Sequence, residues 1–141
     1  QRAFDLAFAP ERVLVCSDAR MQEVYWACFE RAENGLARLI GMEHVSPVTL
    51  VTLPPSWADA PLGSVAGIGR GFRAYPALLG AVGPRVAVAR DDLLPRAPEI
   101  AWLAALDVAA GRLLKPEEAI PVYLRDDVAH PRPGAPTRAP S

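Results

Sequence analysis

The chain has few of the side chains that most often carry catalysis or bind metals: its 141 residues include two cysteines and two histidines. His44 and His130 lie far apart and form no HExxH arrangement, whereas a zinc peptidase holds its metal with three protein ligands. The sequence contains no P-loop and no GxSxG nucleophile elbow. It therefore offers no catalytic residue and no metal ligand set, although a Ser/His/Asp arrangement formed only in three dimensions stays open.

A strong charge of one sign and long apolar runs are lacking too. The 15 basic and 16 acidic residues give a net charge of −1, without the basic excess of a nucleic-acid-binding surface. The apolar stretches are too short or too interrupted to span a bilayer. We therefore expect a cytoplasmic protein without membrane contact, which reaches any RNA only indirectly, through a partner.

The residues that are present suffice for one domain, because 51% of them are hydrophobic and 22% are charged. Prolines number 15, and the segment from His130 to Ser141 is a Pro-rich tail that cannot pack a core. Because the chain begins with Gln1 and not with Met, we expect a fragment or a processed product.

Three strands are predicted at the beginning of the chain. Arg12–Ser17 is apolar on both faces, as central strands are, and Glu23–Arg31 is rich in β-branched and aromatic residues. Asp18–Met21 forms the turn between them. Asn34-Gly35 is a strong hairpin signal, from which Leu36–Met42 returns antiparallel.

The two cysteines lie on the first two of these strands, in apolar runs without CxxC spacing. The second hairpin places Cys28 opposite about Leu39, and Cys16 nearer the other end of the strand pair. We therefore interpret both cysteines as free, buried thiols in a reducing compartment.

Alternating helices and strands are predicted after the meander. Ser46-Pro47 resembles a helix start and predicts a short helix, although the following Val-Thr-Leu-Val-Thr-Leu fits a strand equally well. The further predicted elements are a strand at Ser64–Ile68, a helix at Phe72–Val82 interrupted by Pro76, a strand at Arg85–Ala89, a helix at Pro98–Leu114 and an extended piece at Pro121–Val128.

The predicted helix at residues 98–114 is the clearest one. Pro98 and Glu99 suit its first turn, and Arg112 and Lys115 suit its last. Its apolar stripe comprises Ile100, Leu103, Leu106, Ala110 and Leu114. The whole order predicts an α/β fold with three antiparallel strands, two α/β units and a C-terminal helix, the pattern of a ribonuclease H-like half-domain of actin-like proteins.

Two polar or glycine-rich segments are candidates for function. Asp18, Arg20 and Glu23 surround a turn and either contact a partner or ligand or only stabilise the turn, which we favour. Gly67 and Gly69 lie between a strand and a helix, where backbone N–H groups can approach a nucleotide phosphate, but tight-turn geometry explains glycines equally and is the favoured interpretation.

The neighbouring aromatic residues Tyr25 and Trp26 point to opposite faces of one strand. One of the two should enter the core, and the other should cover a helix or stay exposed. At the far end, Arg125-Asp126-Asp127 is a candidate salt-bridged latch, with local structure favoured over catalysis.

Three stretches carry a resemblance to a known family. Residues 18–27, DARMQEVYWA, followed by Asn34-Gly35, and residues 121–129, PVYLRDDVA, are similar to signature segments of the TsaB family, formerly called YeaZ. A third stretch, Gly67-Ile68-Gly69 through Ala74-Tyr75-Pro76, resembles the strand-to-helix junction of that family. The resemblance spans roughly Val13 to Ala129.

The resemblance implies a non-catalytic scaffold or activator subunit of bacterial tRNA threonylcarbamoyladenosine modification, with no cofactor of its own. The implied partners are a catalytic TsaD-like paralogue and a TsaE-like ATPase. It also implies that residues 1–129 are the C-terminal actin-like half-domain, that residues 130–141 are a tail, and that the N-terminal half, with its Asp-Thr and Ser-Phe-Thr-Gly motifs, is absent.

Two alternatives accompany this hypothesis. The family is historically called a glycoprotease family, so an actin-like enzyme, either a weak nucleotide-binding ATPase or a hydrolase, is the first. The second is self-association of the chain through apolar surface that another half-domain would otherwise cover.

Overall fold

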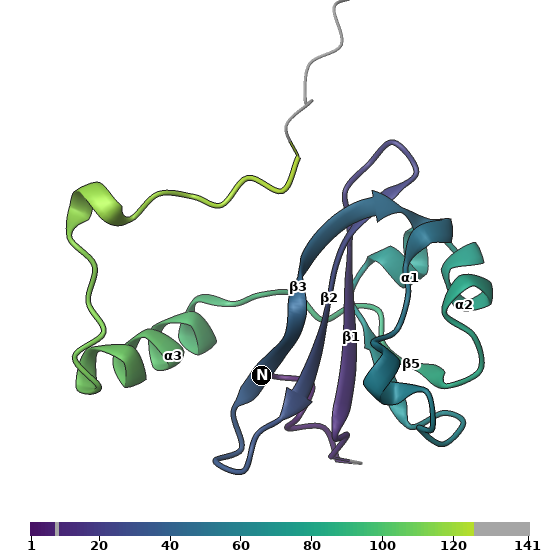
Figure 1. The fold of residues 1–141 in the computed structure, drawn as a ribbon, viewed down its shortest axis with the longest axis horizontal. Helices are drawn as coiled ribbons and strands as arrows, with labels where there is room; N and C mark the ends of the chain where they lie inside the picture. The colour runs from purple at the N-terminus through teal and green to yellow at the C-terminus, as the bar shows by residue number, and fades with distance from the viewer. Residues whose placement is uncertain (8, 126–141) are drawn as a thin grey trace, which may run out of the picture.

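The structure is a computed structural model that describes residues 1–7 and 9–125. Its centre is a five-stranded mixed sheet in the order β3-β2-β1-β4-β5 (Figure 1). β1 pairs antiparallel with β2 and parallel with β4, which places it at the middle of the sheet. The strands are β1 (Arg12–Asp18), β2 (Glu23–Arg31), β3 (Ala37–Pro47), β4 (Val65–Ile68) and β5 (Val86–Arg90).

The predicted meander is confirmed, but its third strand is longer than the sequence suggested. β3 continues to Pro47, and the short helix predicted from Ser46-Pro47 is wrong, because only the 3-10 turn η1 (Val48–Leu50) follows. The Ser46 hydroxyl makes no helix cap; it accepts a hydrogen bond from the Trp26 indole at 2.9 Å instead. The cross-strand contact thus favours extended backbone here.

The register of the second hairpin is one residue away from the predicted one. Arg31 faces Ala37, and Cys28 faces Ile40. The difference arises in the loop, since Gly35 alone adopts a positive φ of 77° and the Ala32 amide bonds to the Leu36 carbonyl. This closes a three-residue loop in place of a two-residue one.

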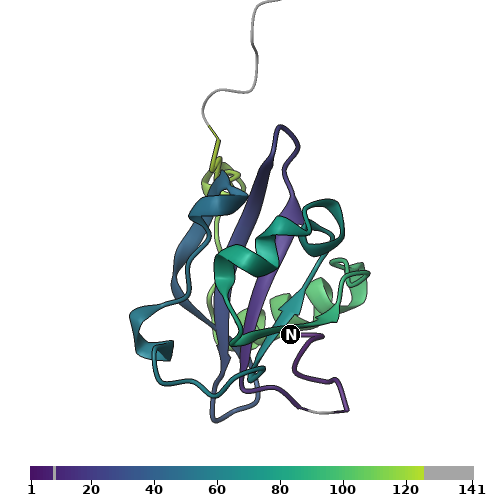
Figure 2. The ribbon, with the colours of Figure 1, turned by 90° about the vertical axis from the view of Figure 1, so that its right-hand side faces the viewer.

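Short helices cover one face of the sheet (Figures 1 and 2). The helix predicted over residues 72–82 is present as α1 (Gly71–Ala74) and α2 (Ala77–Val82), broken at Pro76 as expected. A second 3-10 turn, η2 (Pro55–Trp57), lies on the same side and buries Trp57. The core on this face comprises Leu14, Cys16, Val24, Cys28, Val48, Val51, Trp57, Ala60, Val65, Phe72, Leu78, Val82 and Val86.

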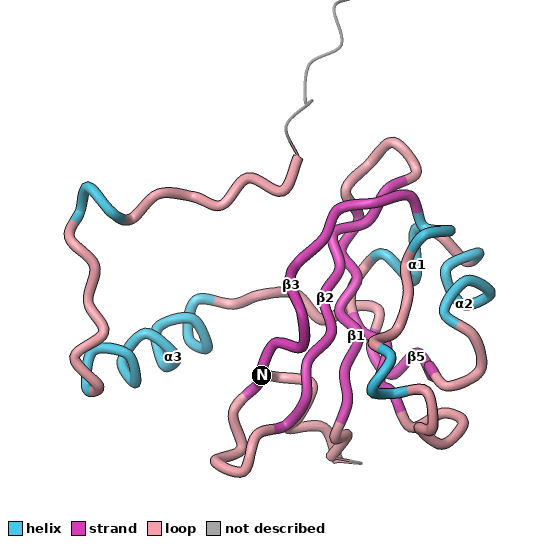
Figure 3. Tube along the Cα trace, in the orientation of Figure 1, coloured by secondary structure: helices cyan, strands magenta, loops and turns pink. Residues whose placement is uncertain are grey.

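The other face of the sheet is less well covered. Ala3 and Phe4 pack there against Val13 and Ala66. Beside them α3 (Ala97–Ala109) leaves the sheet and projects away from it, as the tube in Figure 3 shows most clearly. None of the residues of α3 is buried, so its predicted apolar stripe does not enter the core.

The end of α3 also differs from the prediction. The helix stops at Ala109 rather than Leu114, because Gly111 has φ 72°, a left-handed conformation that ends helices. The last 3-10 turn, η3 (Pro116–Glu118), lies at the distal end of the projection. Residues 121–125 then run as irregular chain, and the predicted extended residues 126–128 and the tail at 130–141 lie outside the described residues.

Within residues 1–7 and 9–125, no helix has the length and apolar character needed to cross a membrane.

Candidate functional site

The glycine junction packs directly onto β1. A Cβ at Gly69, whose φ is +98°, would lie 2.4 Å from the carbonyl oxygen of Cys16, and one at Gly71 would lie 2.9 Å from the same atom. A Cβ at Gly67 would lie 2.8 Å from the ring of Phe72. These contacts give each glycine a packing reason, while nucleotide binding at Gly67 and Gly69 stays a prediction.

The turn between β1 and β2 has an unusual backbone. Arg20, Met21 and Gln22 all adopt left-handed conformations, with φ of 65°, 55° and 63°. Such conformations cost free energy for residues with a side chain, about 1–2 kcal/mol each. The turn persists because its ends are held by hydrogen bonds from the Glu23 amide to the Arg20 carbonyl, at 2.9 Å, and from the Ala19 amide to the Glu23 carbonyl, at 3.0 Å.

Asp18 organises the polar side of this turn. Its Oδ1 accepts hydrogen bonds from the Arg20 amide at 2.8 Å and from the Tyr75 hydroxyl at 2.9 Å, and its Oδ2 accepts one from the Arg20 guanidinium at 3.0 Å. The Arg20 amide bond, and after it the Tyr75 bond, hold the pKa of Asp18 below its usual value. The same hydrogen bond to Asp18 raises the pKa of its donor, Tyr75.

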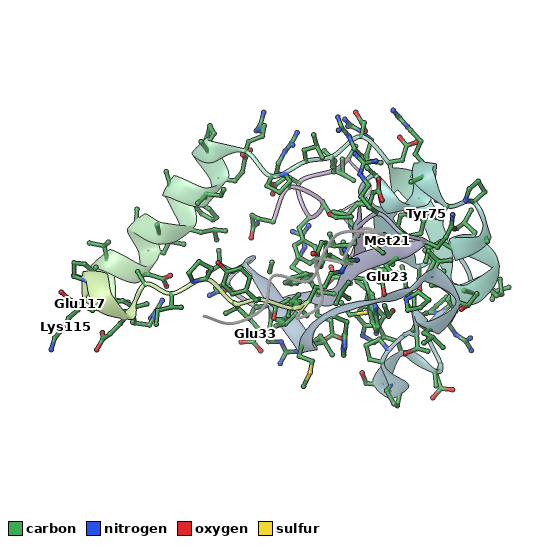
Figure 4. The ribbon with its side chains drawn as sticks, turned by 90° about the horizontal axis from the view of Figure 1, so that it is seen from above. Met21, Glu23, Glu33, Tyr75, Lys115 and Glu117 are labelled. Carbon is green, nitrogen blue, oxygen red and sulfur yellow. The ribbon has the colours of Figure 1, made fainter. Side chains whose placement is uncertain are left out.

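Tyr75 is a site residue that was not predicted from the sequence. It follows α1 and reaches Asp18 across 57 residues of sequence (Figure 4, where Tyr75, Met21 and Glu23 lie together). The signal available was its place in the Ala74-Tyr75-Pro76 segment, but the sequence alone did not show which polar group it would meet.

Glu23 and Arg125 connect the turn to the end of the described chain. The Arg125 guanidinium pairs with the Glu23 carboxylate, and its Cζ lies 5.8 Å from the centre of the Tyr25 ring. The side chains of Arg125 and Glu23 are only 15% and 29% exposed. The latch predicted at residues 125–127 therefore includes Arg125 with Glu23, while Asp126 and Asp127 lie outside the described residues.

The neighbouring aromatic residues Tyr25 and Trp26 of β2 point to opposite faces, as predicted. Trp26 packs against the core on the helix-covered face, while Tyr25 is 36% exposed on the other face beneath Arg125. His44 stacks on Trp26, with ring centroids 4.3 Å apart and planes 19° apart. No cluster of metal-binding side chains occurs in the described part of the chain, and His130 lies outside it.

The cysteines are free and buried, as predicted. Burial raises the pKa of Cys28 to about 12 and that of Cys16 still further. Both thiols are therefore neutral near pH 7 and poor nucleophiles. What the arrangement around the first turn offers chemically is an exposed set of charged and apolar groups for contact with another molecule.

An open apolar groove of about 270 Å³ lies on the less covered face. It lies between the sheet, the first residues of the chain and the beginning of α3, and its walls include Phe4, Val15, Phe29, Ile68 and Leu103. Its polar margin is formed by Arg2, Arg96 and Glu99, with the Arg2 Nε 3.6 Å from a Glu99 carboxylate oxygen.

The sequence comparison decides the family. No family model matches the chain. The protein TsaB of Escherichia coli K12, named for tRNA threonylcarbamoyladenosine biosynthesis, is 38% identical to this chain in an alignment of 124 positions that covers 84% of the chain. Over these residues the chain belongs to the TsaB family.

Solved structures agree with membership of the TsaB family. A crystal structure of an uncharacterized protein with similarity to peptidase YEAZ, from Pseudomonas aeruginosa, superposes with a TM-score of 0.71 at 35% identity and covers 88% of this chain. YeaZ from Pseudomonas aeruginosa gives a TM-score of 0.66 at 36% identity over 86% of the chain. The fold and the sequence therefore point to the same family.

The chain spans about half the length of these TsaB relatives, 49% of the curated protein and 53% of each solved chain. Within that half, the two stretches that resemble TsaB signature segments meet in space. Residues 18–27 form the first turn and β2, and Arg125 of the second stretch contacts Glu23 and Tyr25.

Proposed function

We propose that this chain is a non-catalytic scaffold or activator unit of tRNA threonylcarbamoyladenosine modification. The observation that supports it most is the 38% identity to TsaB over 84% of the chain. In this proposal the chain acts with a catalytic TsaD-like paralogue and a TsaE-like ATPase in the cytoplasm, and it reaches tRNA only through them.

The proposal includes the finer fold assignment, a ribonuclease H-like half-domain of the actin-like type. The strand order β3-β2-β1-β4-β5, with a meander followed by two parallel strands, supports it. Relatives twice as long as this chain support the further proposal that residues 1–129 are one of two such half-domains. That they are the C-terminal one is what the family resemblance implies. Fold alone carries no activity, so the function rests on the family and not on the sheet.

The state of the reactive groups supports a role without chemistry of its own. Both thiols are buried with raised pKa values, and the His44 ring is stacked on Trp26. Asp18 and Tyr75 bond to one another and so hold the turn in place. Each of these groups has a structural partner that explains it.

The first turn is the surface that we propose for contact with a protein partner. Met21, 63% exposed, and the Arg20 side chain, 85% exposed, stand at its tip. Strained backbone held by several hydrogen bonds fixes their direction, and pre-ordered exposed groups lose little entropy on binding.

The test combines binding and activity. The chain is mixed with the purified paralogue, the ATPase, tRNA, ATP and a pre-activated threonylcarbamoyl donor, and the modified nucleoside is measured by mass spectrometry. We expect weak binding of the paralogue and no nucleoside from the chain alone. Arg20→Glu should weaken binding, while Arg112→Glu, an exposed arginine on the distal projection, should not.

The enzyme alternative is tested separately. The chain alone is titrated with ATP by calorimetry. Micromolar ATP binding would favour an actin-like ATPase over a scaffold. NMR shifts of the Gly67 and Gly69 backbone amides on ATP addition would have to locate this binding to the junction. Modified nucleoside formed without the paralogue would contradict the non-catalytic proposal directly.

A further inference from the structure

A second groove, here called the edge groove, opens beside β3, which is the outermost strand of the sheet on this side. Its volume is about 430 Å³, within the range of roughly 300–1,000 Å³ that is usual for ligand pockets. It lies on the face of the sheet that carries the main core, against which two of its walls pack. The walls combine aromatic, proline and aliphatic side chains, among them Trp26, Ile40, Met42, His44, Pro54 and Pro55.

The chemistry of these walls suits an extended, proline-rich peptide. The rings of Trp26 and His44 are stacked with their centroids 4.3 Å apart and form a flat aromatic wall. The Trp26 indole already donates its N–H to Ser46, so it offers ring surface rather than a donor. Met42, 65% exposed, adds apolar surface beside it. Grooves lined by aromatic side chains bind Pro-rich segments in the polyproline II conformation.

The chain carries a segment of this kind in its own tail. Residues 130–141 read HPRPGAPTRAPS, with four prolines, two arginines and no acidic residue. Pro133 and Pro136 are three residues apart, which is one turn of a polyproline II helix, so both rings would stand on one edge of it. Proline also restricts the unbound chain, which lowers the entropy lost on docking.

The described chain ends within reach of the edge groove. Arg125 pairs with Glu23 and lies over the Tyr25 ring, 5.8 Å from its centre. Tyr25 faces Val45 of β3, so Arg125 lies a single strand away from the edge of the sheet. That strand spacing is about 4.8 Å, and the depth of a sheet with its side chains is about 10 Å. Residues 126–130 can span about 16 Å when extended, so the tail can pass around β3 into the groove.

The charges near the groove favour the same occupant. Exposed carboxylates stand on both elements that border it, since Glu43 lies between Met42 and His44 on β3, and Asp59 follows η2. The tail is positively charged through Arg132 and Arg138, which flank its central prolines. Exposed ion pairs add little affinity, so these charges would orient the tail, while the rings would hold it.

We propose that the tail, residues 130–141, docks in the edge groove of its own chain as a polyproline II segment, with Pro133 and Pro136 against the Trp26–His44 stack. The Arg125–Glu23 pair keeps the tail near the groove at a high effective concentration, so a contact too weak between separate molecules persists within one. The inference does not rest on the proposed function, because the first turn, the paralogue and tRNA take no part in it.

The experiment uses the whole chain with a spin label on the tail. Thr137→Cys supplies the attachment point, since Cys16 and Cys28 are buried. In NMR spectra we expect paramagnetic broadening of the His44 and Ser56 backbone amides, which border the groove, and none at Gly111 on the distal projection. A mixture of spin-labelled chain without ¹⁵N and unlabelled ¹⁵N chain should show no such broadening, because the contact forms within one molecule.

Variants test both sides of the contact. The double change of Pro133→Ser and Pro136→Ser removes both rings, and Met42→Lys places a cation in the groove that repels the arginines of the tail. Each should reduce the broadening at His44 at least fivefold. Leu62→Lys, at a 74% exposed position that does not line the groove, is the matched control for Met42→Lys and should leave the broadening unchanged.

A competitor gives an independent readout. A synthetic peptide of residues 129–141, added at millimolar concentration, should displace the labelled tail and restore the His44 signal. Broadening without preference for the groove, broadening centred on the 270 Å³ groove beside α3, or broadening of equal strength in the mixed sample would each overturn the proposal. Indifference to both the proline changes and Met42→Lys, with unchanged circular dichroism, would overturn it as well.

Discussion

The hydroxyl of Tyr75 donates a hydrogen bond to Oδ1 of Asp18 over 2.9 Å and joins the end of β1 to the segment after α1. Because Asp18 also accepts the Arg20 amide, one carboxylate fixes both the strained turn and the covering helices. The turn after β1 and the segment after α1 are therefore coupled through an ionisable group, the Asp18 carboxylate.

Removal of the Tyr75 hydroxyl should weaken the turn in a pH-dependent manner. The pKa of Asp18 is lowered by folding, so its stabilisation is present above the unfolded-state pKa, near 3.9, and is lost as the pH falls through the folded-state value. Tyr75→Phe should therefore lower the thermal midpoint at pH 7 by more than it does at pH 2.

The stability of the same pair should also depend on pH in the alkaline range. Folding raises the pKa of Tyr75, so its contribution is present below its unfolded-state pKa, near 10, and is lost as the pH rises through the folded-state value. Tyr123→Phe, at a 77% exposed tyrosine, should leave both pH profiles unchanged. Equal losses for Tyr75→Phe at pH 2 and pH 7 would count against the role of Asp18.

Gly69→Ala should destabilise the chain by about 2–5 kcal/mol, from a left-handed backbone that a Cβ penalises and from overpacking. The added carbon would lie 2.4 Å from the Cys16 carbonyl oxygen. Gly80→Ala is the matched control in α2, where nothing lies within 4 Å, and should stabilise by ~0.5–1 kcal/mol. Denaturant unfolding measures both, and a tolerated Gly69→Ala would contradict the close packing of the junction against Cys16.

Cys16 and Cys28 should react slowly with a thiol reagent in the folded chain at pH 8, because burial keeps both thiols neutral. Both should react fully after unfolding in guanidinium chloride. A cysteine placed at the exposed position of Leu62 provides the fast reference in the same protein. Rapid reaction of either native thiol would contradict the burial that the fold assigns to it.

Arg125 should hold the end of the described chain to the sheet through Glu23. A double-mutant cycle of Arg125→Ala and Glu23→Ala should give a coupling free energy of about 1–2 kcal/mol, because the pair is largely shielded from water. The same cycle on Arg112 and Asp107, whose side chains are 66% and 56% exposed, should give less than about 0.5 kcal/mol. Similar couplings for the two pairs would show that Arg125 is no latch.

The sequence predicted the strands well where local signals agree. The apolar runs gave β1 and β2, and the break at Pro76 divided α1 from α2. It was wrong at Ser46-Pro47, where a helix-start signal lost to a cross-strand hydrogen bond from Trp26. The exposure of α3 could not be predicted, since periodicity shows that a stripe is apolar but not whether anything covers it.

The candidate site, too, was predicted from the sequence only in part. The residues of the first turn were identified from sequence, but Tyr75 and the Arg125–Glu23 pair were not, because their partners are 57 and 102 residues away. Local patterns report contacts between near neighbours, while these contacts depend on how the sheet brings distant segments together.

The sequence by itself determined the strand meander, the free thiols and the family resemblance, since each depends on neighbouring residues or on a linear pattern. Only the tertiary structure decided that Gly69 lies against Cys16, that two distant segments meet at Glu23, and that α3 projects with its outer face uncovered. Such relations depend on packing between elements, whose geometry no single stretch of chain encodes.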